Sequence, residues 1–177
     1  MTDKQSTFLI VGANGGLGVA IAELASEAGH QVVAMDLGAR YAGRSRATTT
    51  YLKGNATRPI DIARAFRLLP KTGVCHVVNA AGAGVFKPFS RFTVKDFERT
   101  LNANVLTTFL VCQAAIPNLA ARGGGRVFGF GSISENKQLP MNSLYSASKM
   151  ANQSLMKSLN EETKLKNVHF THLRLGA

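Results

Sequence analysis

Cysteine is scarce in this chain of 177 residues, which contains only Cys75 and Cys112. The two lie far apart and lack the spacing of metal ligands, so the sequence predicts neither a metal site nor a disulfide framework. The histidines likewise show no spacing that is typical of metal ligands. We expect two buried thiols in the reducing compartment of a cytoplasmic protein, structural histidines, and no metal.

Acidic residues are also few, since 10 Asp and Glu stand against 21 Lys and Arg, for a formal net charge of +11. Such an excess would normally suggest nucleic acid or another anionic surface as a partner. The basic residues are scattered, however. The one local group, Arg40, Arg44 and Arg46, has no interleaved aromatic residues on which bases could stack. We therefore expect a solvated basic surface and no nucleic-acid partner.

The N-terminus has only a short apolar run. The first apolar run, residues 8–11, is too short for the core of a signal peptide or for a membrane span, so we expect no membrane partner. Internal repeats, low-complexity tracts and linkers are absent as well. With 45% hydrophobic residues the chain can bury one sizeable core without a metal or disulfide. The sequence therefore predicts a single domain over residues 1–177.

Short β-rich runs alternate with longer stretches of helical period along the chain. The expected strands are residues 8–11, 31–35, 50–52, 74–78, 126–130 and 168–175. The expected helices are residues 17–28, 59–69, 96–119 and 143–165. This alternation predicts a Rossmann-like, doubly wound parallel sheet of about six strands in a three-layer α/β/α arrangement. The carboxyl ends of its strands would share one edge, where ligands of such folds bind.

A glycine-rich loop follows the first expected strand and opens the first expected helix. In that place glycines let the backbone approach a pyrophosphate at a helix N-terminus. Cofactor contacts are expected from Gly12, Asn14, Gly15, Gly16, Leu17 and Gly18. Glycines at 12, 16 and 18 fit a GxxxGxG spacing, and those at 12, 15 and 18 fit GxxGxxG. The loop alone leaves both patterns open.

Asp36 ends the second expected strand. A carboxylate there can accept hydrogen bonds from the adenosine ribose hydroxyls and would repel a 2′-phosphate. The sequence therefore favours NAD over NADP as cofactor. Arg40, Arg44 or Arg46 could still supply a partner for a 2′-phosphate, so NADP stays open.

Four polar residues follow in order: Asn104, Ser132, Tyr145 and Lys149. Tyr145 and Lys149 stand four apart, which places both on one face of a helix. Ser132 lies thirteen residues before Tyr145, at the end of the fifth expected strand. Together with the glycine-rich loop, this order and spacing resembles the short-chain dehydrogenase/reductase family over essentially the whole chain. The Ser-to-Tyr spacing resembles the single-domain branch rather than the extended branch.

The resemblance implies a catalytic tetrad of Asn104, Ser132, Tyr145 and Lys149. Tyr145 would be the general acid/base, and Ser132 would hydrogen-bond the substrate oxygen. Lys149 would also hold the nicotinamide ribose, and Asn104 would anchor a water that relays protons to Lys149. The further cofactor contacts that the resemblance implies are Asn55, Ala56, Asn79, Ala80, Ala81, Gly82, Tyr145 and Lys149.

The chemistry of these residue types agrees with the resemblance. Hydride transfer to a carbonyl generates an alkoxide, which needs a proton donor and groups that stabilise the developing charge. The ammonium of Lys149 and the positive ring of an oxidised cofactor would favour the phenolate of Tyr145. We expect an oxidoreductase that transfers a hydride between a nicotinamide cofactor and a small-molecule carbonyl or secondary alcohol.

Two alternatives remain open at this point. One is an NAD-dependent sugar-nucleotide epimerase or dehydratase, which would use the same Tyr-Lys pair. The other is a non-catalytic NAD-binding regulatory protein that keeps the fold for partner binding. An epimerase would retain its cofactor through turnover, a dehydrogenase would exchange it, and a regulator would bind it without turnover.

The end of the chain departs from the family pattern. Leu175 stands where the family usually has Pro before Gly176. We expect the chain to lack the usual C-terminal substrate lid and last strand. The substrate pocket is then expected near Val85, Phe86, Ser134, Glu135, Leu139 and Met141. Two helices resemble those that form subunit interfaces in the family, so a homo-oligomer, a dimer or tetramer, is expected.

Overall fold

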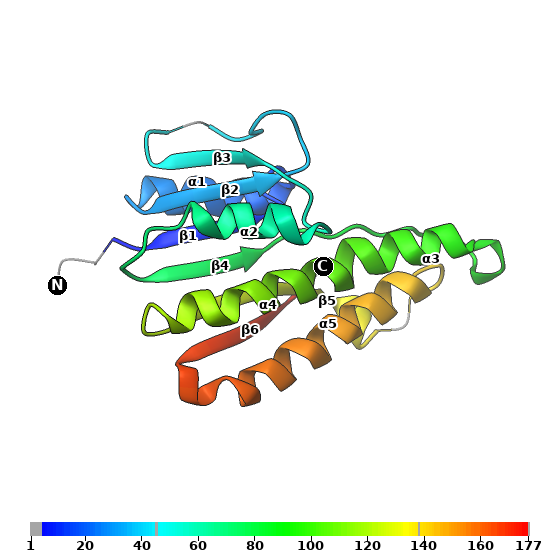
Figure 1. Cartoon of the computed structure of the whole chain (residues 1–177). Helices are drawn as coiled ribbons and strands as arrows, with labels where there is room; N and C mark the ends of the chain where they lie inside the picture. The colour runs from blue at the N-terminus through cyan, green and yellow to red at the C-terminus, as the bar shows by residue number, and fades with distance from the viewer. Residues whose placement is uncertain (1–4, 45, 138, 177) are drawn as a thin grey trace.

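A parallel β-sheet forms the centre of the molecule. The computed structural model describes residues 5–44, 46–137 and 139–176. Within them, six strands pair in parallel in the order β3-β2-β1-β4-β5-β6 (Figure 1), which confirms the predicted sheet. The strands are β1 (Thr7–Val11), β2 (Gln31–Asp36), β3 (Thr49–Lys53), β4 (Cys75–Asn79), β5 (Gly125–Ser132) and β6 (Val168–Leu175).

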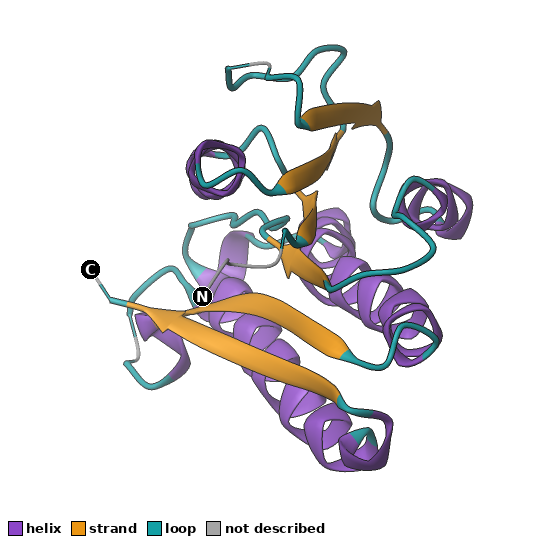
Figure 2. Cartoon of the chain, turned by 90° about the vertical axis from the view of Figure 1, so that its left-hand side faces the viewer, coloured by secondary structure: helices purple, strands orange, loops and turns teal. Residues whose placement is uncertain are grey.

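Helices cover the two faces of the sheet unequally. Figure 2 shows α1 (Gly16–Glu27) on one side of the sheet and the other main helices on the opposite side. That second layer contains α2 (Pro59–Arg67), α4 (Thr107–Ala120) and α5 (Ser143–Glu162). α1 contacts β1 and β2, whereas α4 and α5 contact β4, β5 and β6. The predicted three layers are therefore present, and the α1 layer reaches only part of the sheet.

Alternate strand residues face the two helix layers, because successive side chains of a strand point to opposite faces. In β1, Leu9 and Val11 enter the core under α2, α4 and α5. Ile10, between them, enters the core under α1. All three are at most 1% exposed, and burying a side chain of this size contributes about 1.5–3 kcal/mol.

The long predicted helix over residues 96–119 is a continuous run of three segments. α3 (Val94–Leu101) begins with a capping box, in which the Thr93 hydroxyl accepts from the Asp96 N–H and the Asp96 carboxylate accepts from the Thr93 N–H. A π-helical segment, η2 (Asn102–Leu106), then joins α3 to α4. By length and composition the run Val94–Ala120 could cross a membrane. α4 instead packs on β4 and β5, as the core helix of a folded domain does.

Short 3-10 turns complete the described elements. They are η1 (Phe89–Arg91), η3 (Ile133–Glu135) and η4 (Lys164–Lys166). η3 follows β5 directly and η4 follows α5, so the predicted helix over residues 143–165 ends at Glu162. The predicted buried thiols are confirmed, since Cys75 and Cys112 are 0% and 2% exposed.

Candidate active site

A cavity of about 530 Å³ opens at the carboxyl edge of the sheet. It lies at the ends of β1, β2, β3 and β4 and is closed on one side by α3 and η2. Eight of the expected cofactor residues line it: Gly12, Gly15, Asp36, Asn55, Ala56, Ala80, Ala81 and Gly82. The structure thus gathers residues from four separate strand ends at one place, as expected for a parallel sheet.

The glycines of the loop after β1 have different environments. Gly12 has a φ of 82°, and a Cβ there would lie 2.4 Å from the Ala81 backbone nitrogen. A Cβ at Gly18 would lie 2.1 Å from the Gly12 carbonyl oxygen. A Cβ at Gly16, the first residue of α1, would meet no described atom within 4 Å. The fold therefore requires Gly12 and Gly18, whereas Gly16 leaves open space at a helix N-terminus, which suits a pyrophosphate.

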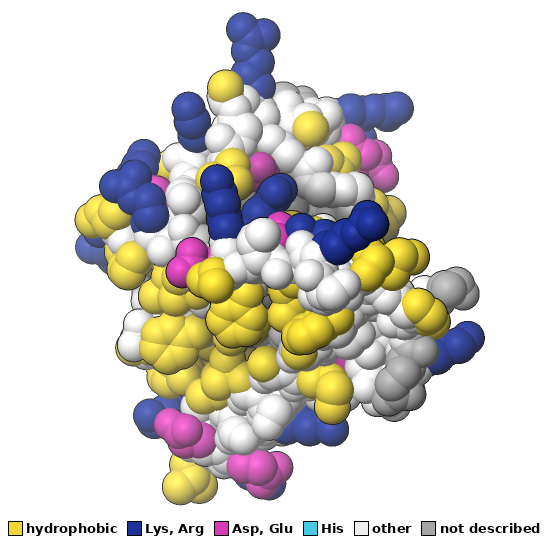
Figure 3. All heavy atoms as spheres, turned by 90° about the vertical axis from the view of Figure 1, so that its right-hand side faces the viewer, with side chains coloured by type: hydrophobic (Ala, Val, Ile, Leu, Met, Phe, Trp, Pro, Cys, Tyr) yellow, Lys and Arg dark blue, Asp and Glu magenta, His cyan; other side chains and the backbone are white. Residues whose placement is uncertain are grey.

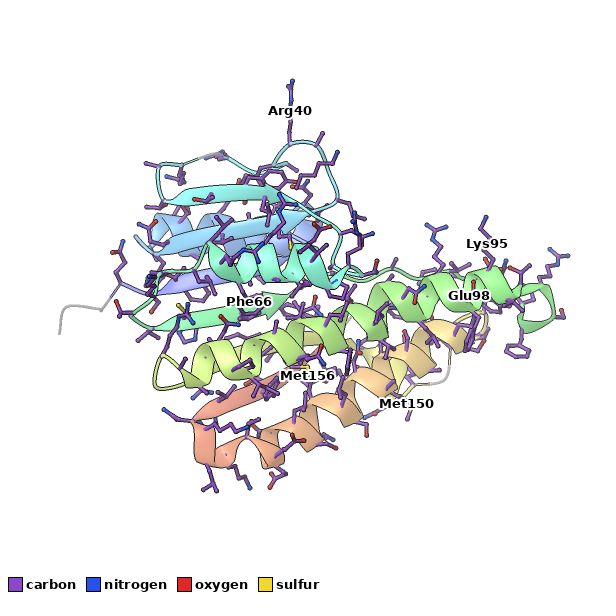
Figure 4. All side chains as sticks on the ribbon, viewed as in Figure 1. Arg40, Phe66, Lys95, Glu98, Met150 and Met156 are labelled. Carbon is purple, nitrogen blue, oxygen red and sulfur yellow. The ribbon has the colours of Figure 1, made fainter. Side chains whose placement is uncertain are left out.

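Asp36 lies beside this loop and lines the cavity. Its carboxylate accepts from the Asn14 N–H at 3.0 Å and from the Gly38 N–H at 3.2 Å. The Asn14 side chain is turned to the following loop, where it donates to the Arg40 carbonyl at 2.9 Å and accepts from the Ala42 N–H at 2.8 Å. Asn14 therefore tethers the loop after β2, and Arg40 itself extends away from the fold (Figure 4).

The other expected cofactor residues lie around the cavity without lining it. Asn79 is buried, donates to the Thr108 hydroxyl at 3.0 Å and accepts from the Ala81 N–H at 3.3 Å. It therefore holds the loop that does line the cavity. Leu17 and Gly18 lie in the first turn of α1. Lining residues that sequence reasoning missed include Leu37, Thr57, Arg99, Asn102, Ala103 and Thr107. Four of them, Arg99, Asn102, Ala103 and Thr107, lie within five residues of Asn104 in the sequence. Their closeness to an expected site residue is the signal that could have identified them.

Asn104 is fully buried within the π-helical segment. Its side chain accepts from the Ala83 N–H at 2.9 Å and donates to the Ala83 carbonyl at 2.8 Å and to the Ser148 hydroxyl at 2.9 Å. Its own carbonyl accepts from the Asn152 side chain at 3.1 Å. Asn104 therefore joins the loop after β4 to α5. Its partner on α5, Ser148, is the residue before Lys149.

Lys149 and Tyr145 lie on the same side of α5. The Lys149 Nζ is 5.5 Å from the centroid of the Tyr145 ring and donates to the Phe130 carbonyl at 2.8 Å. The residue is only 8% exposed, and this burial lowers the pKa of Lys149, while the Glu135 carboxylate raises it in part. A buried ammonium next to a phenol is the arrangement that stabilises a phenolate.

A second cavity, of about 370 Å³, adjoins Tyr145 and Ser132. The Ser132 hydroxyl donates to the Ser134 hydroxyl at 3.1 Å and accepts from the Ser134 N–H at 3.2 Å. The Phe86 ring lies 5.5 Å from the Tyr145 ring. Among the described residues its lining carries no Asp, Glu, Lys or Arg: Phe86, Gly131, Ser132, Ile133, Ser134, Leu139, Asn142, Tyr145, Leu175 and Gly176.

The expected substrate residues divide between this cavity and its surroundings. Phe86, Ser134 and Leu139 line it. Glu135 does not, because its side chain is 0% exposed and turns beneath Ser132. Gly82 lines the first cavity, and a Cβ at this glycine would lie 3.6 Å from the Lys149 Nζ. Lys149 therefore lies beside the first cavity, and Tyr145, on the same side of α5, lines the second.

The surface around these cavities is apolar and basic. Figure 3 looks onto the carboxyl edge, where hydrophobic side chains gather across the middle and lower half and Lys and Arg lie mostly above them. Exposed apolar residues of this end are Phe86, Phe89, Val94 and Phe97. Across the described ranges, no group of three His, Cys, Asp or Glu residues could hold a metal ion.

Comparison with known proteins gives consistent relatives. D-beta-hydroxybutyrate dehydrogenase of Rhizobium meliloti is 27% identical over 164 residues, which cover 86% of this chain and 64% of that protein. Carbonyl reductase family member 4 of Danio rerio is 27% identical over 170 residues, 90% of this chain and 70% of that protein. The chain thus spans about two thirds of the length of these relatives.

A solved structure shows the same fold. The short-chain dehydrogenase from Leptospira borgpetersenii with bound NAD+ superposes with a TM-score of 0.88 at 20% identity, covering 98% of this chain and 72% of that one. A family model of the short chain dehydrogenases matches residues 6–177 of the sequence. This match extends from before β1 to the last residue, so the chain belongs to the short-chain dehydrogenase family.

Proposed function

We propose that the protein is an oxidoreductase that transfers a hydride between a nicotinamide cofactor and a small-molecule carbonyl or secondary alcohol. The observation that carries the proposal is the placement of Tyr145 and Lys149 on one side of α5, with Tyr145 and Ser132 lining one cavity. Membership of a family of oxidoreductases supports it. The relatives described above are dehydrogenases and reductases, which disfavours the epimerase and regulator alternatives.

Each residue of the tetrad has a role that its position supports. Tyr145 is the general acid/base, which gives a proton to the substrate oxygen during reduction and removes one during oxidation. Ser132 donates a hydrogen bond to the same oxygen and so stabilises the charge that develops on it. Lys149 supplies the positive charge that favours the Tyr145 phenolate. Asn104 holds Ala83 and Ser148 and so positions the loop after β4 against α5.

A nicotinamide cofactor fits the residues of the larger cavity. Gly15 and the open space at Gly16 suit the pyrophosphate, Asp36 suits the adenosine ribose, and Asn55 with Ala56 suits the adenine side. When bound, the cofactor supplies or accepts the hydride. Lys149 would hold the nicotinamide ribose through its ammonium. The chain's own residues thus provide a backbone cradle at one end and a cation at the other.

We propose NAD rather than NADP. A carboxylate at Asp36 would repel a 2′-phosphate. Two of the arginines that could bind a 2′-phosphate are directed elsewhere. Arg46 pairs with Glu27 at 2.6 Å, and Arg40 extends away from the fold (Figure 4). Both observations weaken the case for a phosphate site after β2.

Three further observations support proposals for the substrate, the assembly and the location. The uncharged lining of the cavity at Tyr145 favours a neutral small molecule. Met150 on α5 (Figure 4) and Phe109 on α4 are 53% and 45% exposed, which favours a homo-oligomer through this helix layer. The two buried thiols favour a cytoplasmic location.

Calorimetric titration with NADH and NADPH, on the wild type and on Asp36→Ala, tests the cofactor proposal. We expect the wild type to bind NADH more tightly than NADPH. In Asp36→Ala the ratio of the two affinities should fall about 10- to 100-fold, because hydrogen bonds to a charged group contribute about 1.5–3 kcal/mol. A wild type that prefers NADPH would contradict the assignment of Asp36. Binding of neither cofactor would contradict the proposed function.

A further inference from the structure

A buried carboxylate lies directly behind Ser132. The Glu135 side chain is 0% exposed, and its Oε1 accepts from the Ser132 N–H at 3.1 Å and from His172 Nε2 at 2.8 Å. Its Oε2 accepts from the Gln153 side chain at 3.3 Å. Removing a carboxylate from water is costly unless donors satisfy its oxygens. Here the donors come from the end of β5, from β6 and from α5.

Gly131 makes the room for this pair. A Cβ at Gly131 would lie 2.3 Å from both the Glu135 Oε1 and the His172 Nε2. The His172 Nδ1 is buried without a hydrogen-bond partner in the described part of the chain. A protonated ring would leave a buried N–H unpaired there, so the geometry favours neutral His172 that donates from Nε2 to the carboxylate.

We propose that Glu135 is a positioning residue for Ser132 and that His172 holds Glu135 in place. The inference rests on the proposed function, in which Ser132 contacts the substrate oxygen. Ser132 and Glu135 form a reciprocal capping box. The Ser132 hydroxyl accepts from the Ser134 N–H, and the Glu135 carboxylate accepts from the Ser132 N–H. The carboxylate thereby fixes the backbone of Ser132 and the direction of its hydroxyl.

Glu135 also acts on the charge of Lys149. Burial lowers the pKa of Lys149, and the Glu135 carboxylate opposes that shift. The titratable group that is hydrogen-bonded to the carboxylate is His172 on β6, whereas the Nζ of Lys149 on α5 donates to the Phe130 carbonyl. Arg174, farther along β6, is exposed. Without Glu135, Lys149 would release its proton at a lower pH, and Tyr145 would lose its neighbouring cation.

Glu135→Gln tests the role of the charge. The amide oxygen keeps the acceptor that the Ser132 N–H and His172 Nε2 share, and the amide nitrogen meets the Gln153 side chain, which can turn its own oxygen to accept, so the fold is retained. The probe is reduction of the dicarbonyl isatin with NADH and with NADPH between pH 6 and 10. We expect kcat to fall about 10- to 100-fold while KM changes little, and the alkaline limb of the kcat profile to move to lower pH.

Glu161→Gln is the matched control, because Glu161 is an exposed carboxylate on α5, the helix that carries Lys149, and pairs with Lys164. It should leave the kcat and the alkaline limb unchanged. A Glu135→Gln profile that keeps the limb of the wild type, with or without a lower plateau, would overturn the proposal, because a merely structural carboxylate would not move the limb.

Hydrogen exchange of the Ser132 amide, measured by NMR, tests the geometry without any substrate. His172→Leu removes the donor to Glu135, whereas the amide nitrogen of His172→Gln can replace it. We expect exchange at least about 10-fold faster in His172→Leu and near that of the wild type in His172→Gln. Equal exchange in all three would overturn the positioning role. If the wild type reduces no probe, the proposed function fails, and exchange alone decides whether Glu135 positions Ser132.

Discussion

Single residues at the carboxyl edge differ in whether the fold or the ligand requires them. Gly12 has a positive φ and touches the loop after β4, so no side chain fits there whatever is bound. Gly16 faces open space at the start of α1. Sequence reasoning expects both to contact the cofactor, and only the three-dimensional environment separates their roles.

Alanine at these two glycines should therefore have opposite effects. Gly12→Ala should lower the free energy of unfolding by about 2–4 kcal/mol, from backbone strain and from the contact with Ala81. Gly16→Ala should leave stability unchanged or slightly raised, because alanine favours a helix. It should still weaken NADH binding at least about 10-fold, since its methyl group occupies the phosphate space. Urea unfolding and NADH fluorescence measure both quantities. Unchanged NADH affinity in Gly16→Ala would argue against the phosphate position.

Lys149 shows a conflict between stability and activity. Burial holds the pKa of Lys149 below its unfolded value of about 10.4, so the folded state disfavours the charged form. Between the folded and unfolded pKa the unfolded chain binds more protons, and the stability of the wild type rises with pH in that window. Below the folded pKa the full cost of the buried ammonium is present.

Lys149→Met should thus raise the unfolding temperature at pH 7, and its advantage over the wild type should shrink as the pH approaches 10. Turnover should fall at least about 100-fold, because the phenolate of Tyr145 loses its cation. Thermal unfolding at several pH values, together with an isatin reduction assay, checks both effects. A variant less stable than the wild type at pH 7 would show that contacts of Lys149 outweigh its burial.

At the scale of elements, the π-helical segment η2 connects two halves of the site. It carries Asn104, whose side chain bonds to Ala83 in the loop after β4 and to Ser148 on α5. π-helical turns are rare and often occur at functional sites. The helical run thus holds the cofactor cavity and the helix of Tyr145 in a fixed relation.

Asn104→Ala should destabilise the fold by about 2–4 kcal/mol, because the N–H and carbonyl of Ala83 and the buried hydroxyl of Ser148 lose a partner. Asn118→Ala is a control on α4, where the side chain makes one hydrogen bond, to the Ala114 carbonyl, at 2.8 Å. It should cost less than about 1.5 kcal/mol. Urea unfolding compares the two, and equal losses would show that Asn104 is an ordinary helix residue.

Most elements could be predicted from the sequence, because burial repeats every second residue in strands and about every 3.6 residues in helices. The π-helical segment could not, since its five residues, Asn102–Leu106, make about one turn, which is too short for its wider turn to appear as a separate period. The sequence predicts Glu135 in the substrate pocket because it lies in the loop after the fifth strand. Distance along the chain does not give the direction of a side chain, and the capping turn η3 directs Glu135 beneath the sheet edge.

For the whole molecule, the parallel sheet explains why distant residues meet. Asp36, Asn55, Ala81 and Ser132 end four different strands or begin the loops after them, and parallel pairing places all four at one edge. The order β3-β2-β1-β4-β5-β6 puts the first cavity over the ends of β3, β2, β1 and β4, and it puts Ser132, which lines the second cavity with Tyr145, at the end of the next strand, β5. This arrangement predicts hydride transfer from a cofactor in the first cavity to a substrate in the second.

Transfer of deuterium tests that claim most directly. Wild-type protein, Tyr145→Phe and Tyr41→Phe are incubated with isatin and NADH deuterated at the transferable position, and the product is analysed by mass spectrometry. Tyr41→Phe is the matched control, because the buried Tyr41 hydroxyl has no hydrogen-bond partner among the described residues. We expect deuterium on the former carbonyl carbon with the wild type and Tyr41→Phe, and at least about 100-fold less product with Tyr145→Phe. Product without deuterium, or equal product from Tyr145→Phe, would contradict the account.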